Sequence, residues 1–314
     1  MAFALVFPGQ GSQSVGMGRA LADAYPASRA VFEAVDAALG QPLSRTIFDG
    51  PEADLTLTAN TQPALMAVSM AAMKALEAEG FPTSEAAFVA GHSLGEYSAL
   101  CAAGALDVSE AARLLRIRGD AMQAAVPAGE GAMAAILGLD PDAVAALCRE
   151  AAAEGGACEP ANDNGGGQIV VSGSAAAVAR AVALAPEKGA KRAIPLSVSA
   201  PFHCSLMKPA ADRMAAALAD AAIRQPSSPV VANVLASAIS DPGEIRRRLV
   251  EQVTGQVRWR ECVEYLAANG VDTLIEVGNG KVLAGLAKRI DKSLKTVSVG
   301  SPDDIAAALA AVRG

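Results

Sequence analysis

Residues 86–103 limit the fold more than any other segment, because they predict a buried strand, a sharp turn and a helix in direct succession. Residues 86–90 are apolar and short enough for a buried strand, and a helical stretch follows from Glu96 to about Ala103. The turn between them is Gly91-His92-Ser93-Leu94-Gly95. A G-x-S-x-G turn that joins a strand to a helix is a nucleophile elbow, which pushes its serine outward. The chain is therefore expected to form an α/β sheet with Ser93 at the end of one strand.

Other segments repeat this alternation of strand and helix. Residues 3–7 predict a strand that is closed by Pro8-Gly9, and a helix with Pro63 in its first turn is predicted to begin at Thr61. Three later strands, which alternate with helices, are predicted at residues 230–234, 273–277 and 296–299. This order favours a largely parallel α/β sheet. The composition agrees, since 52% of the residues are hydrophobic but only 4% are aromatic, whereas sandwiches and barrels use more aromatic residues.

The middle of the chain predicts a second, smaller unit. Its predicted elements follow the order β-α-β-β-α-β, which is the split βαβ pattern of a ferredoxin-like fold. The strands are expected at residues 132–139, near 158, at 168–171 and at 193–198, and the helices at 141–153 and 175–184. We predict that residues 127–198 form this subdomain, inserted into a large domain made of residues 1–126 and 199–314.

Charge, cysteine content and hydropathy exclude several classes of protein. The formal net charge of −7 argues against general binding to nucleic acid or to anionic membranes. The five cysteines are odd in number and scattered, without a C-x-x-C pair, which argues against a disulfide framework and against a zinc site. The N-terminus lacks the basic region of a signal peptide, and no apolar run is long enough to cross a membrane. These features predict a soluble cytoplasmic protein, with a monomer as the default.

Ser93 is the candidate nucleophile, and the alternative is that it only caps the helix that follows. The strand–turn–helix context favours the nucleophile, because amides at a helix N-terminus point at the reacting oxygen. The sequence holds two histidines that are candidates for its base. His92 adjoins Ser93 on a tight turn, where neighbouring side chains point apart, so a packed role is expected for it. His203 remains as the candidate base, although a lone histidine is more often structural, and no carboxylate stands out as a third member.

Arg118 is predicted to lie on the buried face of its helix. The helix expected from Val108 to Gln123 carries an apolar stripe, and Arg118 lies four residues from both Leu114 and Met122. A guanidinium that faces the core costs on the order of several kcal/mol unless an anion pairs with it. That anion is either a buried Asp or Glu, which is the structural alternative, or the carboxylate of a substrate. If Arg118 binds a substrate carboxylate and Ser93 carries the acyl group of that substrate, the acyl group has a free carboxylic acid at its far end.

Several motifs resemble those of the malonyl-CoA:acyl-carrier-protein (ACP) transacylases, the acyltransferases of fatty-acid synthesis and polyketide assembly. The nucleophile motif continues through Glu96-Tyr97, and the opening Phe7-Pro-Gly-Gln10-Gly11-Ser-Gln13 is similar to the family's first signature. Further matches are Arg118-Gly119 with Met122-Gln123, Pro-Phe-His203-Cys204, Gln252 before Trp259, and Glu276-Val-Gly278-Asn279-Gly280-Lys-Val-Leu283. They extend from Phe7 to Leu283, so the resemblance covers essentially the whole chain.

The resemblance implies a fold and a set of site residues. The family's fold is an α/β-hydrolase-like core with an inserted ferredoxin-like subdomain. The implied site residues are Ser93 as nucleophile, His203 as general base and acid, Gln10 and Leu94 as donors of the oxyanion-hole amides, Arg118 as the binder of the malonyl carboxylate, Gln252 as the residue that orients His203 through its backbone carbonyl, and Gln62 as a pocket-lining residue. With Gln252 in that role, no third carboxylate is needed.

The implied reaction is ping-pong transfer of a malonyl group from malonyl-CoA to the phosphopantetheine thiol of acyl carrier protein, without a metal or a redox cofactor. A discrete enzyme of fatty-acid synthesis is expected, because no ketosynthase or carrier domain is attached. The alternatives are an acyltransferase of a polyketide pathway that uses another acyl-CoA, a serine thioesterase or esterase, and a non-catalytic scaffold that binds carrier protein.

One residue departs from the family's pattern, and another bears on substrate choice. Asn279 stands where the motif more often has proline between its two glycines. We expect it to lie in a loop away from the chemistry and to affect local stiffness more than function. Phe202, before His203, resembles the aromatic residue that narrows the pocket in malonyl-selective members, which argues against methylmalonyl-CoA.

Overall fold

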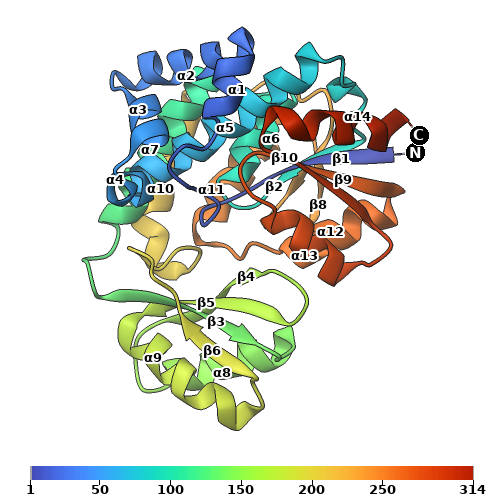
Figure 1. Ribbon diagram of the computed structural model, residues 1–314. Coiled ribbons are helices and arrows are strands. Elements are labelled where there is room, and N and C mark those ends of the chain that lie inside the picture. Colours follow the sequence, from blue (N-terminus) through green and yellow to red (C-terminus); the bar gives the residue numbers. More distant parts are fainter. Residues whose placement is uncertain (1, 314) are drawn as a thin grey trace.

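The computed structural model describes residues 2–313, in which the large lobe is built on a six-stranded sheet (Figure 1). The strand order is β10-β9-β1-β2-β7-β8, and all neighbouring pairs are parallel except β7 and β8. The strands are β1 (Ala2–Phe7), β2 (Phe88–Gly91), β7 (Val230–Ala232), β8 (Ser237–Ile239), β9 (Val271–Val277) and β10 (Lys295–Val299). The predicted largely parallel sheet is confirmed, and the short antiparallel strand β8 adds to it.

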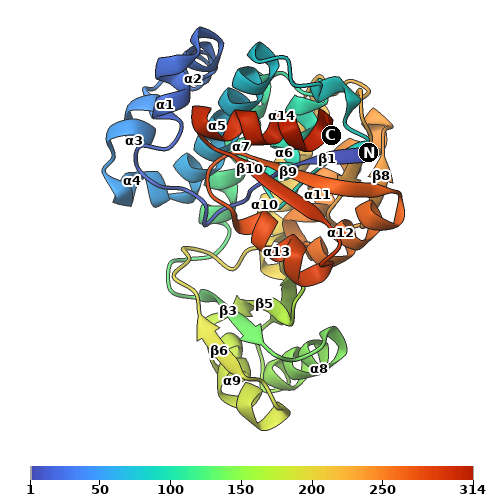
Figure 2. The ribbon, with the colours of Figure 1, turned by 45° about the vertical axis from the view of Figure 1, so that its right-hand side comes forward.

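Helices cover both faces of this sheet, with α5 and α7 on one side and α12 and α13 on the other (Figures 1 and 2). The helices of the large lobe are α1 (Arg19–Ala24), α2 (Pro26–Leu39), α3 (Leu43–Asp49), α4 (Glu52–Thr56), α5 (Thr58–Ala78), α6 (Gly95–Ala102), α7 (Val108–Ala124), α10 (Lys208–Ala219), α11 (Pro242–Thr254), α12 (Trp259–Ala268), α13 (Val282–Ile290) and α14 (Ile305–Arg313). Within residues 2–313, none of them combines the length and the apolarity that crossing a membrane requires.

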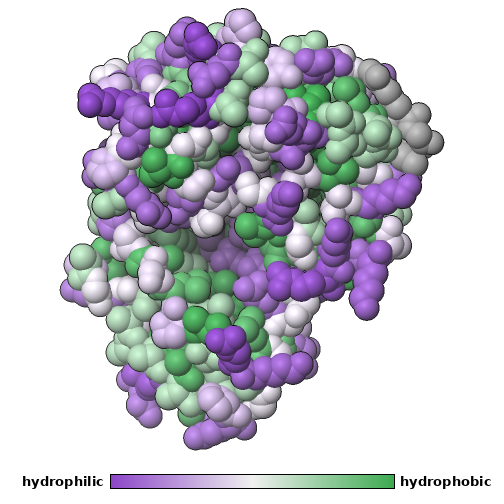
Figure 3. All heavy atoms as spheres, viewed as in Figure 1, coloured by the Kyte–Doolittle hydropathy of each residue, from purple (hydrophilic) through white to green (hydrophobic). Residues whose placement is uncertain are grey.

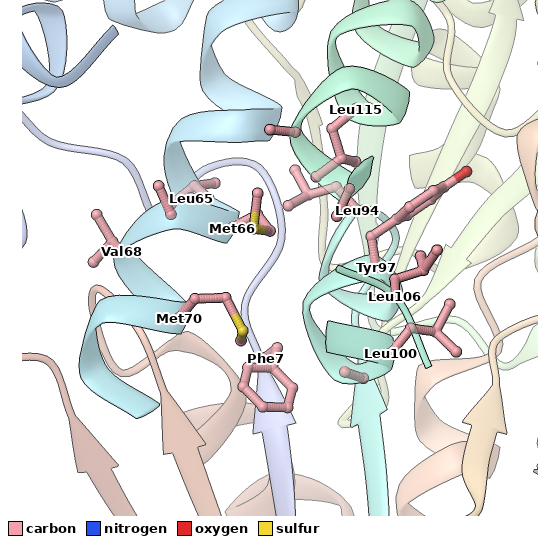
Figure 4. Close-up of a cluster of buried hydrophobic side chains, with 14 of the residues drawn as sticks. Phe7, Leu65, Met66, Val68, Met70, Leu94, Tyr97, Leu100, Leu106 and Leu115 are labelled. Atoms are coloured by element: carbon pink, nitrogen blue, oxygen red, sulfur yellow. The ribbon is translucent and has the colours of Figure 1, made fainter. Parts of the chain in front are cut away.

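Strand β1 shows why the sheet needs cover on both faces. Side chains alternate along a strand, so Phe3, Leu5 and Phe7 join the core beside α5 while the residues between them join the core beside α12 and α13. A central parallel strand of this kind is apolar throughout its length, which is the pattern seen in the sequence. Figure 4 shows Phe7 close to Met70 of α5, next to the side chains of α6. The end of β1 is thereby fixed beside the turn that carries the candidate nucleophile.

The small lobe is a four-stranded antiparallel sheet in the order β4-β5-β3-β6, backed by two helices (Figure 1). Its elements are β3 (Gly131–Leu137), α8 (Pro141–Ala152), β4 (Cys158–Asp163), β5 (Gln168–Ser174), α9 (Ala175–Leu184) and β6 (Arg192–Pro195). Ile136 and Val171 pack against α8 and α9, whereas Met133, Ala135 and Val170 on the opposite face line a cavity between the lobes. One face of this sheet thus builds the lobe's core and the other faces the candidate site.

Helix α5 begins at Thr58, three residues before the predicted start, so Pro63 lies beyond its first turn. The backbone amides of Asn60 and Thr61 both donate to Leu57 O at 2.8 Å, which forms an extra helical turn ahead of the proline. Those bonds involve residues N-terminal to Pro63, and so they do not need its missing N–H. The early start places Gln62 well inside the helix, where its side chain is buried.

Strand β6 ends at Pro195, three residues before the predicted end. The reason is a tight turn in which Val198 N donates to Leu196 O at 3.0 Å, which takes the chain out of the sheet. The chain then returns to the large lobe with the segment that carries His203.

Two glycines allow α6 to begin directly against the sheet. A Cβ atom on Gly95 would lie 2.3 Å from Phe7 O, and one on Gly91 would lie 1.9 Å from the carbonyl carbon of Gly95. Real side chains do not approach backbone atoms so closely, so any larger residue must move α6 away from β1 and β2.

We expect Gly95→Ala to destabilise the protein by about 1–3 kcal/mol, because the added methyl group meets the backbone of β1. The measurement is the free energy of unfolding in urea. Gly285→Ala is the matched control, since Gly285 is also helical but has open space around its Cα atom and should tolerate alanine or gain slightly. Equal stabilities for both variants would contradict the close approach.

Candidate active site

Ser93 lies in the turn between β2 and α6 with a backbone φ of 54°, in the left-handed region that non-glycine residues rarely adopt. Three hydrogen bonds hold this turn. Ser93 N donates to Asn233 Oδ1 at 2.8 Å, Gln252 Nε2 donates to Ser93 O at 3.1 Å, and Asn233 Nδ2 donates to Gly91 O at 2.7 Å. A conformation that costs about 1–3 kcal/mol is thus fixed by side chains from two other elements.

The side chain of Ser93 meets His203. The distance from Ser93 Oγ to His203 Nε2 is 2.7 Å, and His203 Nδ1 lies 2.8 Å from the backbone carbonyl oxygen of Gln252. Since a carbonyl only accepts hydrogen bonds, we assign the ring proton to Nδ1, which leaves Nε2 free to accept the serine proton. The pair therefore has the arrangement of a nucleophile and its base, with a carbonyl in the place of a carboxylate.

The surroundings of His203 keep its ring neutral. Its side chain is buried, and burial followed by the charge of Arg118 lowers its pKa to about 3, against the opposing hydrogen bond to Gln252 O. A neutral imidazole can accept a proton over the whole physiological pH range.

Arg118 is 1% exposed and points at the same serine. Its Nη1 donates to Gln62 Oε1 at 2.7 Å, and its Nη2 donates to Gln252 Oε1 at 2.9 Å and to Ser93 Oγ at 3.2 Å. Arg118 Nε is buried without a partner, and the guanidinium forms no ion pair with any carboxylate of residues 2–313. The structural alternative, a partner Asp or Glu, is therefore not what the structure has. A buried cation that touches only neutral groups can receive an anion.

Glu96 fixes the orientation of Gln252. Its Oε2 accepts hydrogen bonds from Gln252 Nε2 at 2.8 Å and from Asn233 N at 3.1 Å. The amide of Gln252 therefore turns its NH₂ group toward Glu96 and its oxygen toward Arg118. Burial raises the pKa of Glu96 to about 7, although both hydrogen bonds and the charge of Arg118 act against this rise.

Two backbone amides near Ser93 are free to donate. Gln10, in the loop after β1, and Leu94, the residue after Ser93, both line the cavity that contains the serine. Within residues 2–313, neither backbone N–H has a hydrogen-bond partner. Free amides beside a nucleophile are what an oxyanion hole requires.

The cavity has a volume of about 380 Å³ and lies between the two lobes, where the surface is hollowed (Figure 3). Ser93, His203 and Arg118 lie on its wall together with Phe202. Its small-lobe wall combines apolar residues with amide side chains, namely Met133, Ala135, Asn162, Asn164, Gln168 and Val170. In the described part of the chain, no group of three or more metal-binding side chains is placed to hold a metal ion.

His92 makes no bond to the serine hydroxyl. Its Nε2 lies 2.9 Å from Asn164 Oδ1 in the small lobe, and its ring lies 5.7 Å from that of Trp259. Burial lowers its pKa. His92 is thus a packed residue that joins the elbow to the small lobe.

The structure brings five of the predicted site residues into one hydrogen-bonded group, which contains Ser93, His203, Arg118, Gln252 and Gln62. Two further members were not singled out by sequence. Glu96 directly follows Gly95 in the nucleophile motif, and this position could have identified it as a site residue from the sequence. Asn233 follows the short strand β7 and carries no motif of its own. Its role emerges only when β7 pairs with β2.

Known proteins with a similar sequence and fold are acyltransferases. The acyl transferase domain family matches residues 4–307. A malonyl CoA-acyl carrier protein transacylase of Bacillus subtilis is 47% identical over 306 residues, which cover 98% of this chain and 96% of that protein. The acyl-carrier-protein S-malonyltransferase of Bartonella henselae is 56% identical, with a TM-score of 0.97 over 100% of both chains. A malonyl-transacylase solved in complex with a type II PKS (polyketide synthase) acyl-carrier protein is 43% identical, with a TM-score of 0.96 over 99% of this chain and 100% of that one. The chain therefore belongs to the acyl transferase family and, within it, to the malonyl-CoA:ACP transacylases.

Proposed function

We propose that this chain transfers the malonyl group of malonyl-CoA to the phosphopantetheine thiol of acyl carrier protein, by way of a malonyl ester on Ser93, and so supplies malonyl units to fatty-acid elongation. The observation that carries the proposal is the guanidinium of Arg118, which is buried and lacks a carboxylate partner, 3.2 Å from the serine hydroxyl. An acyl group with a free carboxylate completes this pairing, and a malonyl group has one.

In the first half of the cycle, His203 Nε2 takes the Ser93 proton while Oγ attacks the thioester carbonyl. The carbonyl oxygen becomes an oxyanion, which the amides of Gln10 and Leu94 stabilise, and each donor of this kind contributes about 2.7–4 kcal/mol. The C–S bond then breaks and the CoA thiolate takes the proton from His203. Gln252 O holds the ring throughout and stabilises the imidazolium that forms.

In the second half, the carrier's thiol enters the same cavity and gives its proton to His203. Its sulfur attacks the malonyl ester, and Ser93 leaves with that proton. The malonyl carboxylate stays on Arg118 in both halves, so that the ester waits in one position between two thioesters. These steps require no metal and no redox cofactor.

The arrangement of the lobes is part of this proposal. We assign residues 127–198 to a ferredoxin-like subdomain and residues 1–126 and 199–314 to an α/β-hydrolase-like domain. The order β4-β5-β3-β6 with α8 and α9 on one face supports the first assignment, and the elbow at the end of β2 supports the second. A soluble, cytoplasmic monomer remains our expectation.

A second candidate function differs from the first in the carrier protein that accepts the malonyl group. One of the similar structures is a malonyl-transacylase in complex with a type II PKS acyl-carrier protein. A polyketide carrier is therefore the alternative acceptor for the same chemistry. Transfer from malonyl-CoA, methylmalonyl-CoA and acetyl-CoA to purified carriers of both kinds distinguishes the two pathways and tests the choice of acyl group.

Incubation with malonyl-CoA should leave one malonyl group on the protein, because the ester on Ser93 persists until a thiol arrives. Intact-mass measurement detects this adduct, and it should be absent from Ser93→Ala. Rapid release of free malonate without an adduct would instead identify a thioesterase or esterase.

Arg118→Ala should lower kcat/KM for malonyl-CoA by about 30- to 4,000-fold, because loss of a buried charge partner costs about 2–5 kcal/mol. Acetyl-CoA, which has no carboxylate, should be affected much less, so that the preference between the two substrates narrows. Arg113→Ala is the control, since Arg113 lies on the exposed face of α7 in an ion pair with Glu110. An unchanged preference in Arg118→Ala would disprove the clamp.

The rate of Ser93 acylation should change by less than about twofold between pH 7.5 and 5.5. A histidine with the ordinary pKa of about 6.5 would lose roughly tenfold over this range, but the lowered pKa of His203 keeps its ring neutral throughout. Rapid-quench measurements in the wild type and in Glu96→Gln, which removes the carboxyl group whose pKa is about 7, separate the titration of His203 from that of Glu96. A tenfold fall that persists in Glu96→Gln would contradict the neutral base.

A further inference from the structure

The loop that carries Gln10 makes few backbone hydrogen bonds to the rest of the protein. It leaves β1 after Phe7, and we call its residues 8–14 the oxyanion loop. Within residues 2–313, the backbone of this loop makes two hydrogen bonds to residues outside it: Asn279 Nδ2 donates to Ser12 O at 2.6 Å, and Met17 N donates to Ser14 O at 3.2 Å. Gly11 N bonds only to Gln13 Oε1 of the same loop, at 2.7 Å. Among the described residues, Asn279 is therefore the one whose side chain bonds to the backbone of this loop from another part of the chain.

The same amide makes a second bond to this loop. Asn279 Nδ2 also donates to Ser14 Oγ at 3.0 Å, so that one NH₂ group holds two positions of the oxyanion loop. The first of these positions lies two residues after Gln10, whose backbone N–H is free beside the Ser93 cavity.

The segment that presents Asn279 is itself firmly held. Gly278 N donates to Val299 O at 3.0 Å, which fixes the start of the turn to β10. Beyond the turn, the Glu276 carboxylate accepts from Leu283 N at 3.0 Å and from Ala284 N at 2.8 Å, and so caps α13. Asn279 thus extends from a fixed turn toward a loop with few bonds of its own.

The two segments also pack against each other. A Cβ atom on Gly278 would lie 3.0 Å from Pro8 Cγ, and one on Gly280 would lie 3.8 Å from Ser12 Cβ. The contact arises because β9 and β1 are parallel neighbours, whose carboxyl ends lie at the same edge of the sheet. Asn279 lies outside the helices and strands, as expected, but its side chain contacts the loop that carries Gln10.

We propose that Asn279 is a positioning residue for the acyl-transfer reaction, whose side-chain amide holds the oxyanion loop so that the Gln10 N–H stays in place for the oxyanion. The proposal rests on the proposed function, in which Gln10 N is one of the two oxyanion donors. Asn279 itself touches neither the substrate nor Ser93. Its effect reaches the reaction through the oxyanion loop, in which Gly11 alone separates Ser12 from Gln10.

Two variants test the donor role of Asn279. Asn279→Ala removes the amide, and Asn279→Asp keeps its shape but replaces the NH₂ donor with an acceptor. Asn269→Ala is the matched control, because Asn269 Nδ2 also donates to a backbone carbonyl, that of Tyr265, but lies at the end of α12 and makes no contact with the oxyanion loop.

Each protein is compared by three measurements. The first is the single-turnover rate of Ser93 acylation by malonyl-CoA. The second is the affinity for the CoA thioether of trifluoroacetone, whose ketone carbon forms a bond with Ser93 Oγ. The carbonyl oxygen then becomes an oxyanion and the serine proton passes to His203, so that this affinity depends on the oxyanion hole. The third is the affinity for CoA alone, which forms no oxyanion.

Both Asn279 variants should acylate about tenfold more slowly than the wild type, less than the roughly 10²- to 10³-fold loss from removing an oxyanion donor outright. Affinity for the trifluoromethyl ketone should fall by the same factor, while affinity for CoA and the thermal midpoint stay within the range of Asn269→Ala. Acylation by Asn279→Ala within twofold of the wild type would overturn the proposal, as would a parallel loss of CoA affinity and thermal stability. A wild type without any malonyl adduct would instead refute the proposed function.

Discussion

The left-handed backbone of Ser93 is the constraint on which the rest of the site depends. A serine in this conformation turns its hydroxyl away from the sheet, but the turn is stable only if the helix behind it starts close to the strands and if other groups hold its polar atoms. Gly91 and Gly95 meet the first condition by the absence of side chains. Asn233 and Gln252 meet the second with their side-chain amides. The elbow is therefore a product of the whole large lobe and not of its five residues alone.

Gln252 forms hydrogen bonds to three site residues that lie far apart in the sequence, namely Ser93, Arg118 and His203. Its backbone oxygen accepts from the candidate base His203, its side-chain oxygen accepts from Arg118, and its side-chain nitrogen donates to the turn that carries Ser93. A carboxylate in the position of its side chain would pair with Arg118 and neutralise the charge that the proposed malonyl carboxylate needs. Glutamine supplies the hydrogen bonds without the charge. The carboxylate of Glu96 does not bond to Arg118 but accepts a hydrogen bond from the Gln252 side-chain amide and so orients it. In the proposed mechanism, neutral partners around Arg118 are thus a condition for binding the malonyl carboxylate.

Sequence patterns predicted the parts of this molecule that depend on local order. The elbow, the apolar strand β1 and the buried face of α7 all follow from spacing along the chain, and the structure has them close to where they were expected. Gln252, Gln10 and Gln62 were reached only through family resemblance, because a backbone carbonyl, a backbone amide and a neutral side chain leave no pattern in a single sequence. Asn233 and the contact of Asn279 with the oxyanion loop depend on which strands lie side by side, and strand order is not written in local periodicity.

The long return of the chain through the small lobe has a consequence for how the protein is made. Ser93 and Arg118 leave the ribosome early, His203 follows only after the four strands of the small lobe, and Gln252 comes after a further helix. A nascent chain that stops before α11 therefore has the residues of the elbow but lacks Gln252, which holds the turn, His203 and Arg118. Contacts between segments this far apart form late in folding, since their loops must close first. Ser93, the candidate nucleophile, is therefore expected to stay inactive until α11 has been made and has packed against the elbow.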